Sequence, residues 1–98
     1  MKRPWAFICA REGATSKHLR NYCREVYLLG YLPVCPKLQD SQYLVLEDAI
    51  ERSEYTAIVR DKLLRCPMLV VCSRNQDATT NAQIGLAQKY NRIVTTLD

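Results

Sequence analysis

The sequence is short of the features that mark membrane proteins and metalloproteins. No apolar run approaches the roughly 20 residues of a membrane-spanning helix, and the start, Met1-Lys-Arg-Pro-Trp, leads into a strand pattern without a signal-peptide core. There is one histidine, His18, and no Cys-x-x-Cys pair, so a tetrahedral zinc site has no ligand set. We therefore expect a cytoplasmic protein without a metal, a cofactor or a membrane partner.

A strong charge of either sign is missing as well. The net charge of +4 argues against an acidic mimic of nucleic acid, and it falls short of the lysine and arginine stripe of a dedicated nucleic-acid binder. With 48% apolar and 24% charged residues, the composition is that of an ordinary globular protein rather than a disordered one. The length of 98 residues predicts one domain over residues 1–98.

Cysteine is present, but not in the pattern of a disulfide-rich protein. The five cysteines are odd in number and lie inside apolar periodic segments, which is typical of small buried side chains. Cys9 is expected at the end of a strand and near a helix start, where the acidity of a thiol can rise. Because no histidine is placed to pair with it, we interpret Cys9 as an inert core residue. The cysteines are Cys9, Cys23, Cys35, Cys66 and Cys72.

Two kinds of hydrophobic pattern alternate along the chain. Short continuous apolar runs predict strands covered on both faces, and the most apolar run, residues 68–72, predicts a central strand. Spacings of three and four predict helices, of which the first is capped by Thr15 or Ser16 and ends at Gly30. The prolines around the second run place it at a sheet edge. The predicted strands are residues 5–9, 31–35, 68–72 and 92–96.

The middle and the end of the chain give weaker helix signals. Residues 37–43 are polar and predict a loop, some of residues 44–52 is expected to be helical, and a firmer helix covers about 54–65. Residues 73–79 predict a loop after the central strand. Thr80-Asn-Ala-Gln83 matches a helix capping box, so the last helix is expected to begin there and to end at Asn91.

This order of elements predicts an α/β fold. Strands that alternate with helices over short connections form a parallel sheet with right-handed crossovers, here a small Rossmann-like or flavodoxin-like three-layer domain with four strands in the order 2-1-3-4. The chain then reverses direction between the first and third strands, which leaves a ligand crevice at their carboxyl ends. The residues expected to line it are Cys9, Ala10, Arg11, Glu12, Gly13, Ser73, Arg74 and Asn75, with the start of the last helix.

Several of these residues favour an anionic ligand. Arg11 and Arg74 can hold a phosphate or a carboxylate through paired hydrogen bonds, and the amides around Gly13 and the first helix start can bind an anion. The competing interpretation is that these are solvated surface residues, and it stays open.

Short motifs through nearly the whole chain resemble one protein family. In order and spacing they are similar to the small nucleoside 2-deoxyribosyltransferase-like proteins, many of them encoded by phages and bacteria. The resemblance implies a nucleotide-like ligand in the crevice, with Lys37, where the family often has histidine, and Thr79 and Gln83 at the site. The motifs are Phe7-Ile8-Cys9-Ala10-Arg11-Glu12-Gly13, Tyr22-Cys23-Arg24, Leu32-Pro33-Val34-Cys35-Pro36, Gln42-Tyr43-Leu44, Leu64-Arg65-Cys66 and Gln83-Ile84.

The chain departs from the family pattern at its catalytic positions. The first loop lacks the family's Ser-Pro-Tyr-Arg-Gly sequence, Pro67 stands in place of an aspartate, and Thr79 in place of a glycine. Gln83 occupies the position of the glutamate that, in true transferases, attacks the anomeric carbon of the sugar. A neutral amide cannot supply that negative charge, whereas it can still cap a helix.

Three functions therefore stay open. The first is a catalytically degenerate domain that binds a nucleotide-like ligand or a protein partner, for example as a phage inhibitor of host defence. The second is an enzyme that cleaves or transfers an N-glycosidic bond of nucleosides or nucleotides with Glu12 or Asp77 as its carboxylate. The third is a nucleic-acid-binding accessory protein that uses the basic face of the first helix; a homo-oligomer is compatible with each. The basic residues are Arg11, Lys17, Arg20, Arg24 and Lys37.

Overall fold

The central feature of the structure is a four-stranded parallel sheet in the order β2-β1-β3-β4. The structure is a computed structural model that describes residues 2–73 and 76–97. The predicted fold class, strand order and strand direction are confirmed, because β1 pairs in parallel with β2 and with β3, and β3 pairs in parallel with β4. The strands are β1 (Trp5–Cys9), β2 (Leu32–Val34), β3 (Met68–Val71) and β4 (Ile93–Thr96).

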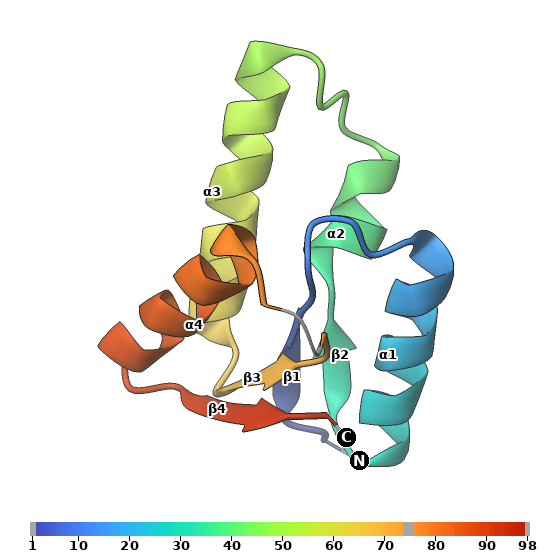
Figure 1. Cartoon of the computed structure of the whole chain (residues 1–98), viewed down its shortest axis with the longest axis vertical. Coiled ribbons are helices and arrows are strands. Elements are labelled where there is room, and N and C mark those ends of the chain that lie inside the picture. The colour runs from blue at the N-terminus through green and yellow to red at the C-terminus, as the bar shows by residue number, and fades with distance from the viewer. Residues whose placement is uncertain (1, 74–75, 98) are drawn as a thin grey trace.

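Helices cover both faces of this sheet and make a three-layer arrangement (Figure 1). Alternate residues of a strand point to opposite faces, so Ala6 and Ile8 of β1 pack with α1 (Ser16–Leu28), while Phe7 and Cys9 pack toward α3 (Ala49–Arg65) and α4 (Ala78–Lys89). All four of these β1 residues are buried. The continuous apolar run in the sequence reflects this burial on both faces.

The ends of two helices follow the local signals in the sequence. Thr15 is the N-cap of α1, and after its C-terminus Gly30 takes a φ of 104°, a left-handed conformation that glycine adopts without strain. At the end of α4, Asn91 takes a φ of 59° and the amide of Arg92 donates to the carbonyl of Ala87 at 2.8 Å. The predicted roles of Gly30 and Asn91 as helix terminators are confirmed.

Residues 37–43 are not the loop that their polarity predicts. They form α2 (Pro36–Gln39) and the 3-10 helix η1 (Asp40–Gln42). Pro36 stands in the first turn of α2, where its fixed φ suits a helix and its missing N–H costs nothing. The turn is buried on one side through Pro36 and Asp40, and this tertiary burial is not visible in the local polarity.

Two helix starts also differ from the predicted ones. The segments expected in 44–52 and 54–65 are one continuous helix, α3. Its start is fixed by Asp48, which accepts a hydrogen bond from the amide of Glu51 at 3.0 Å. The last helix begins at Ala78 rather than at Thr80, and its capping box joins Asp77 and Thr80. The capping role predicted for Gln83 is therefore wrong, because Asp77 is the N-cap and accepts the free amide of Thr80 in the first turn. Thr79, predicted in a loop, lies in the first turn of α4.

Candidate functional site

A cavity of about 840 Å³ opens at the carboxyl end of β1, between α2, α3 and α4. In Figure 1, α3 extends past the sheet and α2 stands opposite it. The cavity lies where the strand order predicts a ligand crevice. Its size is within the range of about 300–1,000 Å³ for small-molecule sites. Much of its wall is apolar, with Phe7, Leu63 and Leu86 among the lining residues.

The loop after β1 is fastened to the segment that precedes α4. The amide of Glu12 donates to Oδ2 of Asp77 at 2.9 Å, and the amide of Arg11 donates to Oγ of buried Ser73 at 3.0 Å. Oδ1 of Asp77 accepts the amide of Thr80, so both carboxylate oxygens are engaged. The bonds from the Thr80 and Glu12 amides hold the pKa of Asp77 below its usual value. Asp77 therefore shapes the loop and the helix start, and its carboxylate is not a free nucleophile.

Glu12 brings a carboxylate to the cavity wall. Its Oε2 accepts a hydrogen bond from Oγ1 of Thr79 at 2.6 Å, and both residues line the cavity. The side chain of Glu12 is exposed, so its other oxygen faces solvent or a ligand. The loop after β1 and the first turn of α4 therefore meet at the cavity wall.

Lys37 fastens α2 to the same loop. Its Nζ donates to the carbonyl oxygen of Arg11 at 2.8 Å and also to the carbonyl of Glu12. Burial is the main cause that lowers the pKa of Lys37, and the nearby Glu12 and Asp77 carboxylates oppose it. Because two of its three donors hold backbone carbonyls, Lys37 positions the loop and has one donor left for an anion.

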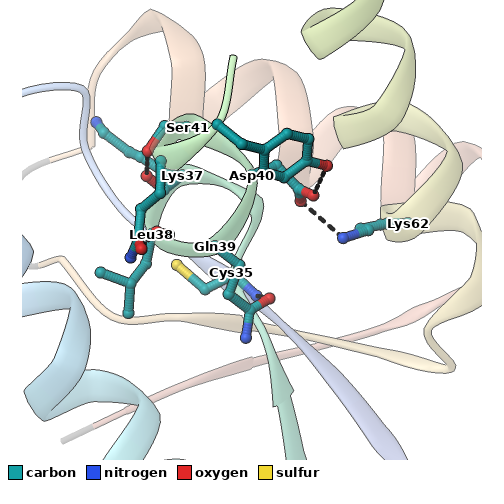
Figure 2. Close-up of polar contacts among 9 residues, drawn as sticks. Cys35, Lys37, Leu38, Gln39, Asp40, Ser41 and Lys62 are labelled. Carbon is teal, nitrogen blue, oxygen red and sulfur yellow. Dashed lines mark hydrogen bonds and ion pairs between the residues drawn. The ribbon is translucent and has the colours of Figure 1, made fainter.

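An ion pair between Asp40 and Lys62 joins η1 to α3 (Figure 2). Lys62 Nζ donates to Oδ2 of Asp40 at 2.7 Å, and the hydroxyl of Tyr43 donates to Oδ1 at 2.5 Å. Asp40 is only 4% exposed. Burial acts to raise the pKa of its carboxyl, but the bonds from Lys62 and Tyr43 together with the charge of Lys62 outweigh burial and lower it. The ion pair thus holds η1 against α3.

Tyr55 of α3 contributes a neutral donor to the cavity. Burial, followed by the negative fields of Cys35, Asp40 and Glu12, raises the pKa of its phenol to about 12. The hydroxyl keeps its proton at neutral pH. Its ring adds an aromatic face to the lining, on which a planar ligand can stack.

Gln83 presents an unsatisfied acceptor in the cavity wall. Its side chain lines the cavity, and within the described part of the chain no donor reaches its Oε1, which is buried. A buried carbonyl oxygen without a partner costs about 1–3 kcal/mol, so such atoms are few in folded proteins and call for an explanation. A ligand donor that enters the cavity would remove this cost.

The structure brings some of the predicted site residues together and separates others. Ala10, Glu12, Lys37, Thr79 and Gln83 line the cavity. Cys9 is buried with its Sγ directed to the carbonyl of Thr80 at 3.8 Å, and burial raises the pKa of its thiol to about 12. Arg11 and Ser73 hold the loop in place and do not line the cavity. Gly13 is exposed, with nothing within 4 Å of an added Cβ. Arg74 and Asn75 lie outside the described residues.

The basic residues of the third hypothesis do not form one free set. Lys17, Arg20 and Arg24 are exposed on α1 at the spacing of one helix face, as predicted. Lys37 is half-buried, and its ammonium group is bound to backbone carbonyls. Of the five basic residues, those left free to form a positive surface are therefore the three on α1 and Arg11 in the loop before it.

Sequence reasoning missed the α3 side of the cavity. Tyr55, Thr56, Val59 and Arg60 line it, as does Ser41 of η1. Their helical spacing indicates only a buried stripe. What directs part of that stripe into a cavity is the length of α3, which carries Tyr55 and Thr56 beyond the sheet, and that length was divided between two segments in the prediction.

Three further findings are negative. In residues 2–73 and 76–97, no three histidine, cysteine, aspartate or glutamate side chains gather as metal ligands would. Within the same ranges, no helix is long and apolar enough to cross a bilayer. In comparisons with known proteins, the chain matches neither a protein-family model nor a curated protein.

Proposed function

We propose that this domain binds a nucleoside or nucleotide-like small molecule in the cavity between α2, α3 and α4, without breaking its glycosidic bond. The observation that carries the proposal is the buried Oε1 of Gln83 in the wall of that cavity, which has no hydrogen-bond partner among residues 2–73 and 76–97. Since no described residue donates to this acceptor, a ligand donor can satisfy it. Sugar hydroxyls and the exocyclic amines of bases are such donors.

The distribution of polar and apolar groups fits the same ligand class. Val59, Leu86 and the ring of Tyr55 offer apolar contact to a base, while Glu12 and Thr79 add polar groups to the lining. Sugar hydroxyls can donate to the free oxygen of the Glu12 carboxylate. A few polar groups in a mainly apolar pocket fix the orientation of a ligand. The resemblance to nucleoside 2-deoxyribosyltransferase-like proteins supports the same class.

Loss of the transferase reaction follows from the residue at position 83. Retaining chemistry at a sugar carbon needs a carboxylate nucleophile, and an amide does not form the covalent intermediate. Asp77 does not replace it, because both of its oxygens accept backbone amides. Binding without turnover is the function left to the cavity.

The test is a calorimetric titration of the purified protein with adenosine, deoxyadenosine, deoxycytidine and their 5′-monophosphates. We expect at least one to bind, and Gln83→Leu to weaken its binding about tenfold, the effect of one hydrogen bond of roughly 1.4 kcal/mol. Gln88→Leu is the matched control, since Gln88 is an exposed glutamine on the same helix. If no compound of the panel binds, or if Gln83→Leu binds as well as the parent, the proposal is wrong.

Glu12 supports one alternative, an active glycosidase or transferase, because its carboxylate reaches the cavity. Incubation of the bound nucleoside with the protein, followed by chromatography for free base, separates the two functions. Under our proposal no base is released, and Gln83→Glu creates measurable release. Release by the parent protein that disappears in Glu12→Gln would establish the enzyme instead.

A further inference from the structure

The strand β4 forms an open edge of the sheet (Figure 1). Its four residues are Ile93, Val94, Thr95 and Thr96, all β-branched and none charged. The other edge strand, β2, is shorter and contains Pro33, which cannot donate to a further strand. Natural edges usually carry a proline, a charge or a bulge that prevents pairing with another chain, and the described part of β4 has none of these.

The outward backbone groups of β4 can be identified from its bonds to β3. The amide of Ile93 donates to Pro67 at 3.1 Å and the amide of Leu97 to Val71 at 2.9 Å. Backbone groups of a strand alternate between its two sides, so Ile93, Thr95 and Leu97 point to β3. Val94 and Thr96 therefore direct their N–H and C=O groups away from the sheet.

We infer that two copies of this chain pair through β4, antiparallel, about a twofold axis at Thr95. This register places Val94 opposite Thr96 of the second copy, and the two residues exchange both of their outward hydrogen bonds. The twofold axis repeats the exchange, which gives four bonds and pairs every outward group of the strand. The sheets of the two copies then form one continuous sheet of eight strands.

The side chains agree with the same register. Ile93, Thr95 and Leu97 lie on the α1 side of the sheet, since Ile93 and Thr95 pair with Met68 and Val70. Ile93 is 59% exposed, and the register sets it opposite Leu97 of the second copy, so that two apolar side chains bury each other. At the twofold axis, Thr95 of one copy lies opposite Thr95 of the other.

Among the described residues at this edge, no charge stands in the way of the pairing. Arg92, the residue before β4, directs its guanidinium to the carbonyls of Leu64 and Tyr90, at 2.7 Å and 2.9 Å. A hollow of about 200 Å³, lined by Leu29, Met68, Thr95 and Leu97, lies beside the edge. A pair of four-residue strands buries less than the roughly 1,200 Å² of a standard interface, so we expect a weak dimer.

Sedimentation velocity over a roughly hundredfold range of concentration, up to about 1 mM, tests the inference. The parent chain should shift from monomer to dimer over this range. Thr95→Lys and Thr95→Glu should each be monomeric, since like charges then face each other at the axis, and an equal mixture of the two variants should dimerise again. Rescue by opposite charges depends on the register, which a general loss of fold cannot imitate.

Two further variants test the edge separately from the side chains. Thr96→Pro removes an outward N–H without touching the bonds to β3, and it should also give a monomer with an unchanged circular dichroism spectrum. Leu28→Lys, at a site 65% exposed on α1, is the matched control and should dimerise like the parent. A parent chain that stays monomeric throughout, or a dimer that survives both Thr95→Lys and Thr96→Pro, would overturn the inference.

Discussion

Oγ1 of Thr79 donates a hydrogen bond to Oε2 of Glu12 at 2.6 Å, although the two residues are 67 positions apart in the chain. One comes from the first turn of α4 and the other from the loop after β1. The bond exists because β1 and β3 are parallel neighbours, so the segments that follow them leave the sheet at the same edge. It fixes one oxygen of the only carboxylate among the described residues that line the cavity.

Replacing Gln83 with leucine should stabilise the protein while it weakens ligand binding. The substitution removes a buried oxygen without a partner and keeps a side chain of similar length, so we expect the free energy of unfolding to rise by about 1 kcal/mol. Urea unfolding checks this value. A fall in stability of similar size would mean that Gln83 is satisfied in the free protein.

The ion pair of Asp40 and Lys62 should be worth more than an ordinary surface pair. Lys62→Met leaves a buried carboxylate with only the Tyr43 hydroxyl as partner, which should cost about 2 kcal/mol of unfolding free energy in a urea titration. The control is Asp61→Asn, because the exposed pair of Asp61 and Arg65 should contribute less than about 0.5 kcal/mol. Equal losses would place the Asp40 pair in the same class as a surface pair.

The same carboxyl predicts a dependence on pH. Its pKa in the folded chain is below the ordinary value of 3.8, so it stabilises the fold fully above that value. The contribution is lost as the pH falls through the lower, folded pKa. Unfolding midpoints at pH 7 and near pH 2.5 should therefore differ less in Asp40→Asn than in the parent. An identical pH dependence of the two proteins would contradict the assignment.

Two glycines with open space around them should respond to alanine in opposite directions. Gly30 has a φ of 104°, so Gly30→Ala should cost about 1–2 kcal/mol through backbone strain alone. Gly85 lies inside α4 with nothing within 4 Å of an added Cβ, so Gly85→Ala should add about 0.5–1 kcal/mol through helix propensity. Thermal or urea unfolding measures both. Stabilisation by Gly30→Ala would rule out the left-handed helix end.

The buried thiols should be unreactive in the folded protein. Burial is the main cause that raises the pKa of Cys9 and Cys72 to about 12 and of Cys66 to about 11. At pH 8 only about one such thiol in a thousand, or fewer, is ionised. Iodoacetamide followed by peptide mass spectrometry should modify these three cysteines only after unfolding in urea. Rapid modification of Cys9 in the native protein would revive it as a candidate nucleophile.

Patterns within single segments were enough to predict the sheet. The runs around Phe7 and Leu69 are apolar at every position because both faces of those strands are covered, and this burial follows from local composition. Gly30 and Asn91 ended their helices as predicted, since a left-handed conformation is a property of the residue itself. The strand order then followed from the general rules for parallel sheets.

The failures share a different cause. Pro36 to Gln42 is polar along the sequence, yet its fold depends on Asp40 meeting Lys62 from another helix, 22 positions away. The last helix starts at Ala78 because Asp77 accepts amides from both Thr80 and Glu12, and the second of these comes from the other end of the chain. Contacts between segments that are remote in the chain do not produce a repeating pattern in the sequence.

The sequence by itself determined the parallel α/β fold and the edge of the sheet at which the cavity lies. Each of these depends on a residue's own chemistry or on a repeat within one segment. Only the tertiary structure decided that α3 and α2 enclose a cavity there, that Asp77 and Lys37 hold its loop, and that Oε1 of Gln83 is left without a donor. These depend on distances between segments remote in the chain, which packing sets and composition does not encode.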